Sequence, residues 1–195
     1  MKKTIALLFL ALSSAGIHAQ ENNESDYLLF EGKDTTFCTI TVLARSAGNV
    51  SDIEYYDVAG EKHKVDRKEI KNVKSLRVAG ISMDYVPIKA SKPDKYKRHI
   101  EIELNGKIIV YNHTRIIAGI DQNGDRQLYQ VVGAGAAIHM IKLPDGNYYD
   151  YKESDIKKYV APYMLKFKPF ADSFKEPISM RNIEAAILKY NELGE

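Results

Sequence analysis

A run of oxygen-bearing side chains at alternate positions is the first place where this sequence could do chemistry. Asp121, Asn123 and Asp125 stand two residues apart within Asp-Gln-Asn-Gly-Asp. Carboxylate and amide oxygens spaced in this way can wrap around a calcium ion. An EF-hand loop would also need glycine at its sixth position and glutamate at its twelfth, where this sequence has Arg126 and Val132. We therefore prefer a tight turn between two strands and keep a calcium site as the alternative.

Paired carboxylates and histidines are the other residue types that could support catalysis or hold a transition metal. Glu101 and Glu103 stand two apart among isoleucines, which places both on one face of a strand. Two carboxylates can cleave a glycosidic bond, but a solvated strand face shows the same alternation, and we prefer that interpretation. The histidines after residue 19 lack the close spacing of a zinc site: His63, His99, His113 and His139. We expect no catalytic residue and no metal ligand here, and we interpret His139 as a hydrogen-bonded core or edge residue.

Motifs for nucleophilic catalysis and for nucleotide cofactors are missing from the sequence. It contains no Gly-x-Ser-x-Gly, the turn that presents a nucleophilic serine. Gly133-Ala134-Gly135 lacks the last glycine of a dinucleotide-binding loop. Cys38 is the only cysteine, so the chain has no internal disulfide. Its apolar neighbours predict a buried side chain and not a reactive thiol. We expect no cofactor.

Three tyrosines in one short segment are our predicted binding residues: Tyr148, Tyr149 and Tyr151. A tyrosine combines a large apolar ring with a polar hydroxyl group, and recognition surfaces are enriched in it. The alternative is that Tyr149 and Tyr151, or Tyr148 alone, pack beneath helices that follow in the chain. The sequence leaves both interpretations open.

The elements that must position these residues are mostly strands, and the clearest pair is a hairpin. Apolar and polar residues alternate over 98–104, Asn105-Gly106 follows, and an apolar run then reaches Tyr111. Asn-Gly between such runs is typical of a two-residue hairpin turn, because both turn positions need a positive φ. The pairs expected from such a turn are Leu104–Lys107, Ile102–Ile109 and Ile100–Tyr111.

Other runs rich in β-branched and aromatic residues are separated by turn residues and predict further strands. We expect them at 27–30, 37–43, 52–58, 62–65, 75–78, 82–89, 115–120, 127–132, 138–143 and 148–151. Past Tyr151 the apolar spacing becomes helical. We expect Ser154 to cap a first helical segment, which Pro162 and Pro169 break into short helices. We expect Ser179 to cap the last helix, whose apolar face is Met180, Ile183, Ile187 and Tyr190.

These elements predict an α+β fold, mostly antiparallel β-sheet built from hairpins, with C-terminal helices packed on it. The N-terminal part could close into a small barrel-like sheet. We divide the chain into a signal peptide (1–19), a flexible lead-in (20–26), a small β subdomain (27–89), an antiparallel sheet (90–153) and C-terminal helices (154–195). Residues 27–195 could equally form one folded unit.

The order of these pieces resembles that of a group of β-rich exported bacterial proteins with a C-terminal helical hairpin. The matching segments are Ile53-Glu54-Tyr55-Tyr56, Lys68-Glu69-Ile70, the hairpin from Glu101 to Tyr111, Tyr148-Tyr149-Asp150-Tyr151, and Ile187-Leu188-Lys189-Tyr190-Asn191. The resemblance covers most of the chain after residue 19. It implies the fold class, and it implies no particular reaction. This chain lacks the cysteine that such proteins often carry between the two helices.

The first nineteen residues have the pattern of a secretory signal peptide. Lys2 and Lys3 precede the apolar run 5–12, and small residues then lead to Ala19. The run is too short to span a bilayer, which takes roughly 20 apolar residues. We expect cleavage before Gln20 and a protein exported to the periplasm or the extracellular space. We expect no transmembrane segment once the leader is removed.

Charge is unevenly spread along the chain. Residues 20–60 carry eight acidic and two basic side chains, whereas 61–107 carry thirteen basic and seven acidic ones. A basic segment can bind nucleic acid or an anionic lipid surface. The same lysines could occupy the solvated faces of one folded unit, and we prefer that interpretation. The sequence contains no recognisable nucleic-acid-binding module, so we expect no nucleic-acid partner.

Export, antiparallel strands and many tyrosines favour a non-enzymatic function. We expect a binding or structural module of the cell envelope or secretome, whose partner is an unknown protein or envelope component. The alternative is a hydrolase that acts on envelope polymers, with carboxylates or histidines that meet only in three dimensions. An enzyme should have converging titratable groups, whereas a binding module should have an exposed or tyrosine-lined surface.

Overall fold

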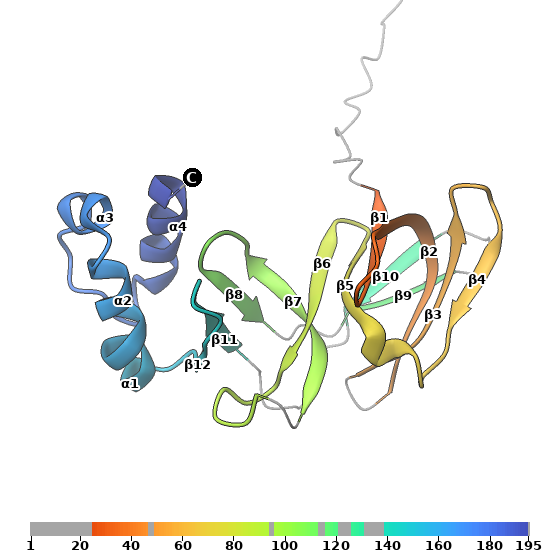
Figure 1. Ribbon diagram of the computed structural model, residues 1–195, viewed down its shortest axis with the longest axis horizontal. Coiled ribbons are helices and arrows are strands. Elements are labelled where there is room, and N and C mark those ends of the chain that lie inside the picture. The colour runs from red at the N-terminus through yellow and green to blue at the C-terminus, as the bar shows by residue number, and fades with distance from the viewer. Residues whose placement is uncertain are drawn as a thin grey trace, which may run out of the picture.

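The computed structural model describes residues 25–46, 49–93, 96–112, 116–120, 126–130 and 139–194. It is an α+β protein: a mostly antiparallel sheet followed by C-terminal helices, as predicted (Figure 1). The expected leader (1–19) and the alternative calcium ligands Asp121, Asn123 and Asp125 lie outside the described residues. None of the helices in the described ranges has the length and apolar character needed to cross a membrane.

The described residues form twelve strands of one sheet, and every described strand pair is antiparallel. The strand order is β10-β9-β2-β1-β5-β6-β7-β8-β11-β12, and β3 branches from β2 and carries β4. The bounds are β1 (Asp26–Phe30), β2 (Thr35–Ser46), β3 (Asn49–Asp57), β4 (Lys62–Val65), β5 (Val73–Val78), β6 (Ile81–Pro87), β7 (Lys97–Leu104), β8 (Ile109–Asn112), β9 (Ile116–Ile120), β10 (Arg126–Gln130), β11 (His139–Lys142) and β12 (Tyr148–Asp150). A short 3-10 helix, η1 (Ile70–Asn72), precedes β5.

The long strand β2 organises the N-terminal half of the sheet. It pairs with β3 on one side, and on the other with β1 near its start and with β9 at Leu43. The strands enclose an apolar core that includes Leu28, Ile40, Ile53 and Leu76. Cys38 is buried in this core, as predicted. Period-two alternation therefore buries one face of each strand, and hydrophobic burial holds this half together.

A buried carboxylate fixes the start of β1. Asp26, the last residue of the expected lead-in, is only 6% exposed. Its Oδ2 accepts the N–H of Ile40 at 2.9 Å, and its Oδ1 accepts the N–H of Ala79 at 2.8 Å. A buried carboxylate is tolerated because backbone donors replace the water it loses. Asp26 thereby joins β2 to the turn between β5 and β6.

The β7–β8 hairpin has a different register from the predicted one. Ile102 pairs with Tyr111 and Leu104 with Val110, and Glu103 is the extra residue of a β-bulge between them. The predicted pairs Leu104–Lys107, Ile102–Ile109 and Ile100–Tyr111 were therefore wrong. The loop covers residues 105–108, two more than an Asn-Gly turn would need.

The longer loop and the shifted register result from a side chain of the last helix, which is far away in the sequence. Asn191 is buried, and its Oδ1 accepts the N–H of Ile108 at 2.9 Å. Its Nδ2 donates to the carbonyl oxygens of Ile108 and Asn105 at 2.9 and 3.4 Å. The Asn191 amide thus satisfies backbone groups that a tight turn would have paired with each other. A local turn preference is overridden by a tertiary contact.

The C-terminal helices are more continuous than predicted. The first runs through α1 (Glu153–Asp155), a π-helical stretch η2 (Ile156–Val160) and α2 (Ala161–Leu165). Its N-cap is Lys152 and not Ser154, which lies inside the helix. Pro162 does not break it, because the backbone switches from the π to the α pattern beside this residue, which itself lacks an N–H to donate. The chain does break before α3 (Lys168–Ser173), which carries Pro169 in its first turn.

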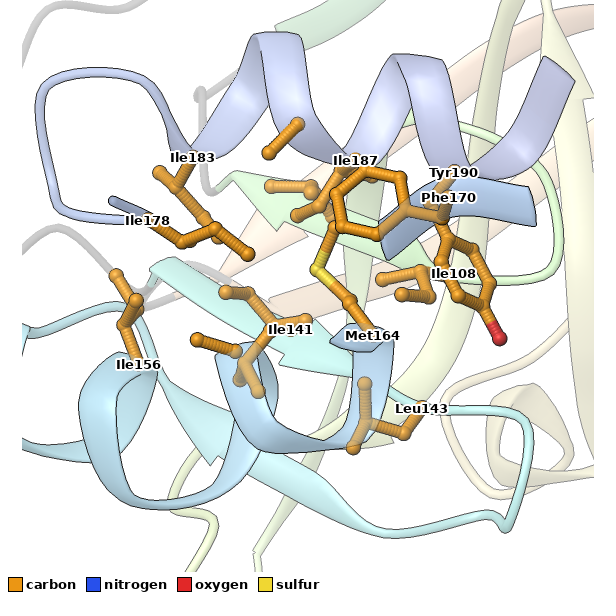
Figure 2. Packing of buried hydrophobic residues seen from close by; sticks show 14 residues of the cluster. Ile108, Ile141, Leu143, Ile156, Met164, Phe170, Ile178, Ile183, Ile187 and Tyr190 are labelled. Carbon is orange, nitrogen blue, oxygen red and sulfur yellow. The ribbon is translucent and has the colours of Figure 1, made fainter. Parts of the chain in front are cut away.

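The last helix, α4 (Ile183–Gly194), packs against the core that it shares with β8 and β11. Ser179 and Asn182 form the turn that leads into it, where Asn182 Oδ1 accepts the Ser179 N–H at 2.9 Å. Met180, expected on its apolar face, precedes the helix and is exposed. Figure 2 shows Ile183, Ile187 and Tyr190 of α4 facing Met164 and Phe170 of the neighbouring helices, Ile141 of β11 and Ile108 of the β7–β8 loop.

Candidate functional site

The three predicted binding tyrosines do not form one surface. Successive residues of a strand point to opposite faces, so Tyr148 packs on the side of Val86, Ile100, Tyr111 and Met140. Tyr149 and Tyr151 pack instead against the core beneath the helices. Tyr149 stacks on Tyr159 of the first helix at a centroid distance of 4.9 Å. Burial is the main cause that raises the pKa of both Tyr148 and Tyr149.

Tyr148 lines one of two adjoining cavities, which we call together the basic groove. The first cavity holds about 300 Å³ and is lined by Tyr85, Pro87, Ala90, Pro93, Lys97, Gly146, Asn147 and Tyr148. The second holds about 160 Å³ and is lined by Val50, Arg67, Ile70, Lys71, Tyr85, Lys97, Arg98 and His99. Tyr85 and Lys97 belong to both walls, so the two cavities meet at these residues.

Strand pairing sets the centre of the basic groove. Tyr85 of β6 lies opposite His99 of β7, and Pro87 lies opposite Lys97, so these four side chains share one face. The rings of Tyr85 and His99 are 5.0 Å apart. His99 is buried, and its Nε2 is 2.8 Å from the carbonyl oxygen of Val73. His99 is therefore fixed in the lining of the groove between the Tyr85 ring and the backbone of Val73.

The charges of the second cavity have one sign. Among the described residues, its lining includes Arg67, Lys71, Lys97 and Arg98 and no acidic residue. Across the described ranges, none of these four side chains has a carboxylate oxygen within 4.0 Å. Lys74 lies close by, with its Nζ 6.0 Å from the centre of the Tyr85 ring, but it does not line the cavity and is paired with Glu31 Oε1 at 3.1 Å. Because like charges repel unless an anion lies between them, this cluster favours a negatively charged ligand.

A second cluster of functional side chains lies where the sheet meets α4. His139 Nε2 is 3.0 Å from Glu103 Oε2, and the His139 ring stacks on Tyr151 with centroids 3.6 Å apart and planes 5° apart. The Tyr151 hydroxyl donates to Glu184 Oε1 at 2.8 Å. Burial and this bond to Glu184 raise the pKa of Tyr151, so its hydroxyl remains a donor. The cluster joins a histidine with carboxylates, the residue types that the hydrolase alternative needs.

A third cluster belongs to the β3–β4 hairpin. His63 Nε2 is 2.8 Å from Asp57 Oδ2, and the His63 ring stacks on Tyr55 at 5.1 Å. Asp57 Oδ1 accepts the N–H groups of Ala59 and Glu61, each at 2.9 Å. These bonds lower the pKa of Asp57, and the one from His63 contributes most. Asp57 therefore has a structural explanation as the residue that closes this turn.

Some of the residues singled out in the sequence lie in these clusters. Tyr148 lines the basic groove. His139 is hydrogen-bonded, as expected, and lies at the start of β11, a strand that pairs with both β8 and β12. Glu101 is buried, so the expectation that it shares a solvated face with Glu103 was wrong. The groove residues Tyr85, Lys97 and Arg98 were missed as site residues. Their signal was the excess of basic residues over 61–107, which was interpreted as solvated surface.

The chain was also compared with known proteins. No protein-family model, no curated protein and no solved structure matches it.

Proposed function

We propose that this chain is an exported, non-enzymatic binding protein that recognises a phosphate-bearing component of the cell envelope in the basic groove. The observation that carries the proposal is the set of four cations in the second cavity, which have no carboxylate partner among the residues that the structure describes. Export is proposed from the leader-like pattern of residues 1–19. The resemblance to exported β-rich proteins supports the same location.

The chemistry of the groove favours phosphate. Arg67 and Arg98 can each present two parallel N–H donors to one phosphate group, and Lys71 and Lys97 add mobile positive charges. The adjoining cavity is lined by tyrosine and proline side chains, which suit an apolar or sugar-like part of the same ligand. The groove thus offers one charged and one mostly uncharged compartment. Tyr85 and Lys97 contact both parts of such a ligand.

The test compares two triple variants that lose the same charge. Arg67→Ser/Lys71→Ser/Lys97→Ser removes three exposed cations of the groove. Lys166→Ser/Lys168→Ser/Arg181→Ser removes three exposed cations of the helical end and is the matched control. Binding is measured to vesicles with phosphatidylglycerol, to neutral phosphatidylcholine vesicles, to soluble polyphosphate and to polyglutamate. Since each basic residue contributes about 1 kcal/mol at an anionic surface, the groove variant should bind about a hundredfold more weakly.

The arms of this experiment separate the sources of the phosphate. Binding to phosphatidylglycerol vesicles without binding to polyphosphate identifies a lipid headgroup, and the opposite result identifies a soluble phosphorylated polymer. Equal losses in the two triple variants would show that attraction follows net charge and not the groove. Equal binding to polyglutamate would contradict the preference for phosphate. Both of these results would overturn the proposal.

A further inference from the structure

We propose that Glu103, His139 and Glu184 form a zinc-type transition-metal site that joins α4 to the sheet. The sequence predicted no metal ligand among the histidines, because these three residues come from β7, β11 and α4. In the fold, one ligand atom of each lies within 4.8 Å of the other two. This site is separate from the basic groove, and the inference does not rest on the proposed function.

The donor set selects the class of metal. One imidazole nitrogen and two carboxylate oxygens suit zinc and its first-row neighbours, whereas calcium and magnesium take oxygen ligands. Zinc binds such atoms at about 2.0–2.2 Å, which places tetrahedral ligands about 3.4 Å from one another. The His139–Glu103 distance of 3.0 Å is already close to that value. Small rotations of the exposed Glu103 and Glu184 side chains would bring their oxygens to the distances that zinc needs.

The fold holds each ligand in place before any metal binds. Glu103 is the extra residue of the bulge in β7, and bulges commonly redirect a side chain at a functional site. The His139 ring is held parallel to Tyr151 at 3.6 Å, and the Tyr151 N–H donates to the His139 carbonyl oxygen at 2.9 Å. Both contacts limit how far the imidazole can turn.

Tyr151 supplies the outer partner that metal sites usually have. Its hydroxyl donates to Glu184 Oε1 at 2.8 Å, which orients the carboxylate and leaves Oε2 for the metal. Outer partners of this kind fix ligand geometry and commonly change metal affinity by about 10–100-fold. Three protein ligands leave a fourth position for water or for a ligand atom. The hairpin cluster of Asp57, Glu61 and His63 lacks this arrangement of three separate elements, and it serves as the internal control.

The test is a titration of the full chain with zinc chloride, followed by calorimetry and by elemental analysis after dialysis. We expect one zinc ion per chain, and we expect calcium and magnesium chloride not to compete. His139→Gln and Glu184→Gln should each weaken zinc binding at least tenfold, and Tyr151→Phe should weaken it by a smaller factor. His63→Gln should leave the affinity unchanged. Circular dichroism without metal shows whether each variant is folded, and the exposed Glu184 is the substitution least able to disturb folding.

Cobalt gives an independent readout of the ligands. Co²⁺ bound at this site should show visible absorption bands of a four- or five-coordinate ion, and His139→Gln should remove them. The proposal is overturned if zinc does not bind saturably, or if saturable binding survives both His139→Gln and Glu184→Gln. The proposal is also overturned if His63→Gln weakens zinc binding as much as His139→Gln does.

Discussion

At the scale of single residues, one amide decides how the β7–β8 loop closes. Asn191 makes three hydrogen bonds to the backbone of Asn105 and Ile108, and it does so from a buried position on α4. Two of the bonded groups belong to Ile108, whose side chain is part of the core beneath the helices. The Asn191 side chain therefore stabilises both the loop and the contact between α4 and the sheet.

Asn191→Ala should be strongly destabilising. The N–H and carbonyl of Ile108 would lose their partner in a place from which water is excluded, and each unsatisfied buried group costs about 1–3 kcal/mol. We expect the free energy of unfolding to fall by about 2–4 kcal/mol in urea titrations. Asn105→Ala is the control, because within the described part of the chain its side chain bonds only the exposed N–H of Gly106, at 3.0 Å. A loss below about 1 kcal/mol in both variants would contradict the assigned role of Asn191.

At the scale of elements, the sequence predicts the strands well because their information is local. Alternating apolar residues placed β4 at its observed bounds and most other strands within a few residues. The last helix was predicted from the spacing of Ile183, Ile187 and Tyr190, all of which are buried. The predicted register of β7 and β8 was wrong because the observed one depends on Asn191, over 80 residues away. The predicted helix break at Pro162 was also wrong, since the π-helical stretch before this residue accommodates it.

The β7–β8 loop allows a test of its own. Gly106 has a φ of +151°, and a methyl group on its Cα would overlap the side chain of Asn191. Gly146 also has a positive φ, of +85°, but a Cβ there has nothing within 4 Å. Alanine strains the backbone at both positions, by on the order of 1–3 kcal/mol. Only at Gly106 does the added Cβ also overlap another side chain, so Gly106→Ala should lose more stability than Gly146→Ala. We expect that loss to be about 1–3 kcal/mol larger in urea unfolding.

A combined variant shows whether the overlap is the cause. Asn191→Ala removes Cγ and Nδ2, the two atoms nearest the added methyl group, and leaves only Cβ, at 3.0 Å. Adding Gly106→Ala to this variant should therefore cost less than it does in the native protein. Contacting residues of this kind give non-additive changes in stability. Strict additivity of the two substitutions would mean that Gly106 and Asn191 do not interact.

At the scale of the whole molecule, the sites are where sequence-based prediction ends. The second cavity of the basic groove is lined by residues from four parts of the chain: Val50, then Arg67, Ile70 and Lys71, then Tyr85, and then residues 97–99. The candidate zinc site joins residues 36 and 45 positions apart along the chain. Spacing along the chain carries no signal for such groups, since they meet only after β6, β7 and β11 have paired with their neighbours. The basic excess over 61–107 was visible, but its convergence on one cavity was not.

The tyrosines spread through the whole molecule predict how its stability depends on pH. Burial is the main cause that raises the pKa of Tyr55, Tyr111, Tyr148, Tyr149, Tyr151 and Tyr190. A tyrosine with a raised pKa keeps its proton in the folded state, whereas in the unfolded chain it ionises at about pH 10. The unfolded state then holds fewer protons, so the free energy of unfolding must fall as the pH rises above about 10.

Tyr111 is the residue on which this can be tested, since it is fully buried and its hydroxyl donates to Asp84 Oδ2 at 2.8 Å. At pH 8, Tyr111→Phe should lose about 1 kcal/mol with that bond. Above about pH 10 the native protein should lose a further 1.4 kcal/mol per pH unit on account of Tyr111 alone, and the variant should not. The gap between the two urea unfolding curves should therefore close within about one pH unit. Tyr96→Phe, which alters an exposed ring, is the control and should follow the native protein throughout. A gap that stays constant from pH 8 to pH 11 would show that Tyr111 ionises equally in the folded and unfolded states.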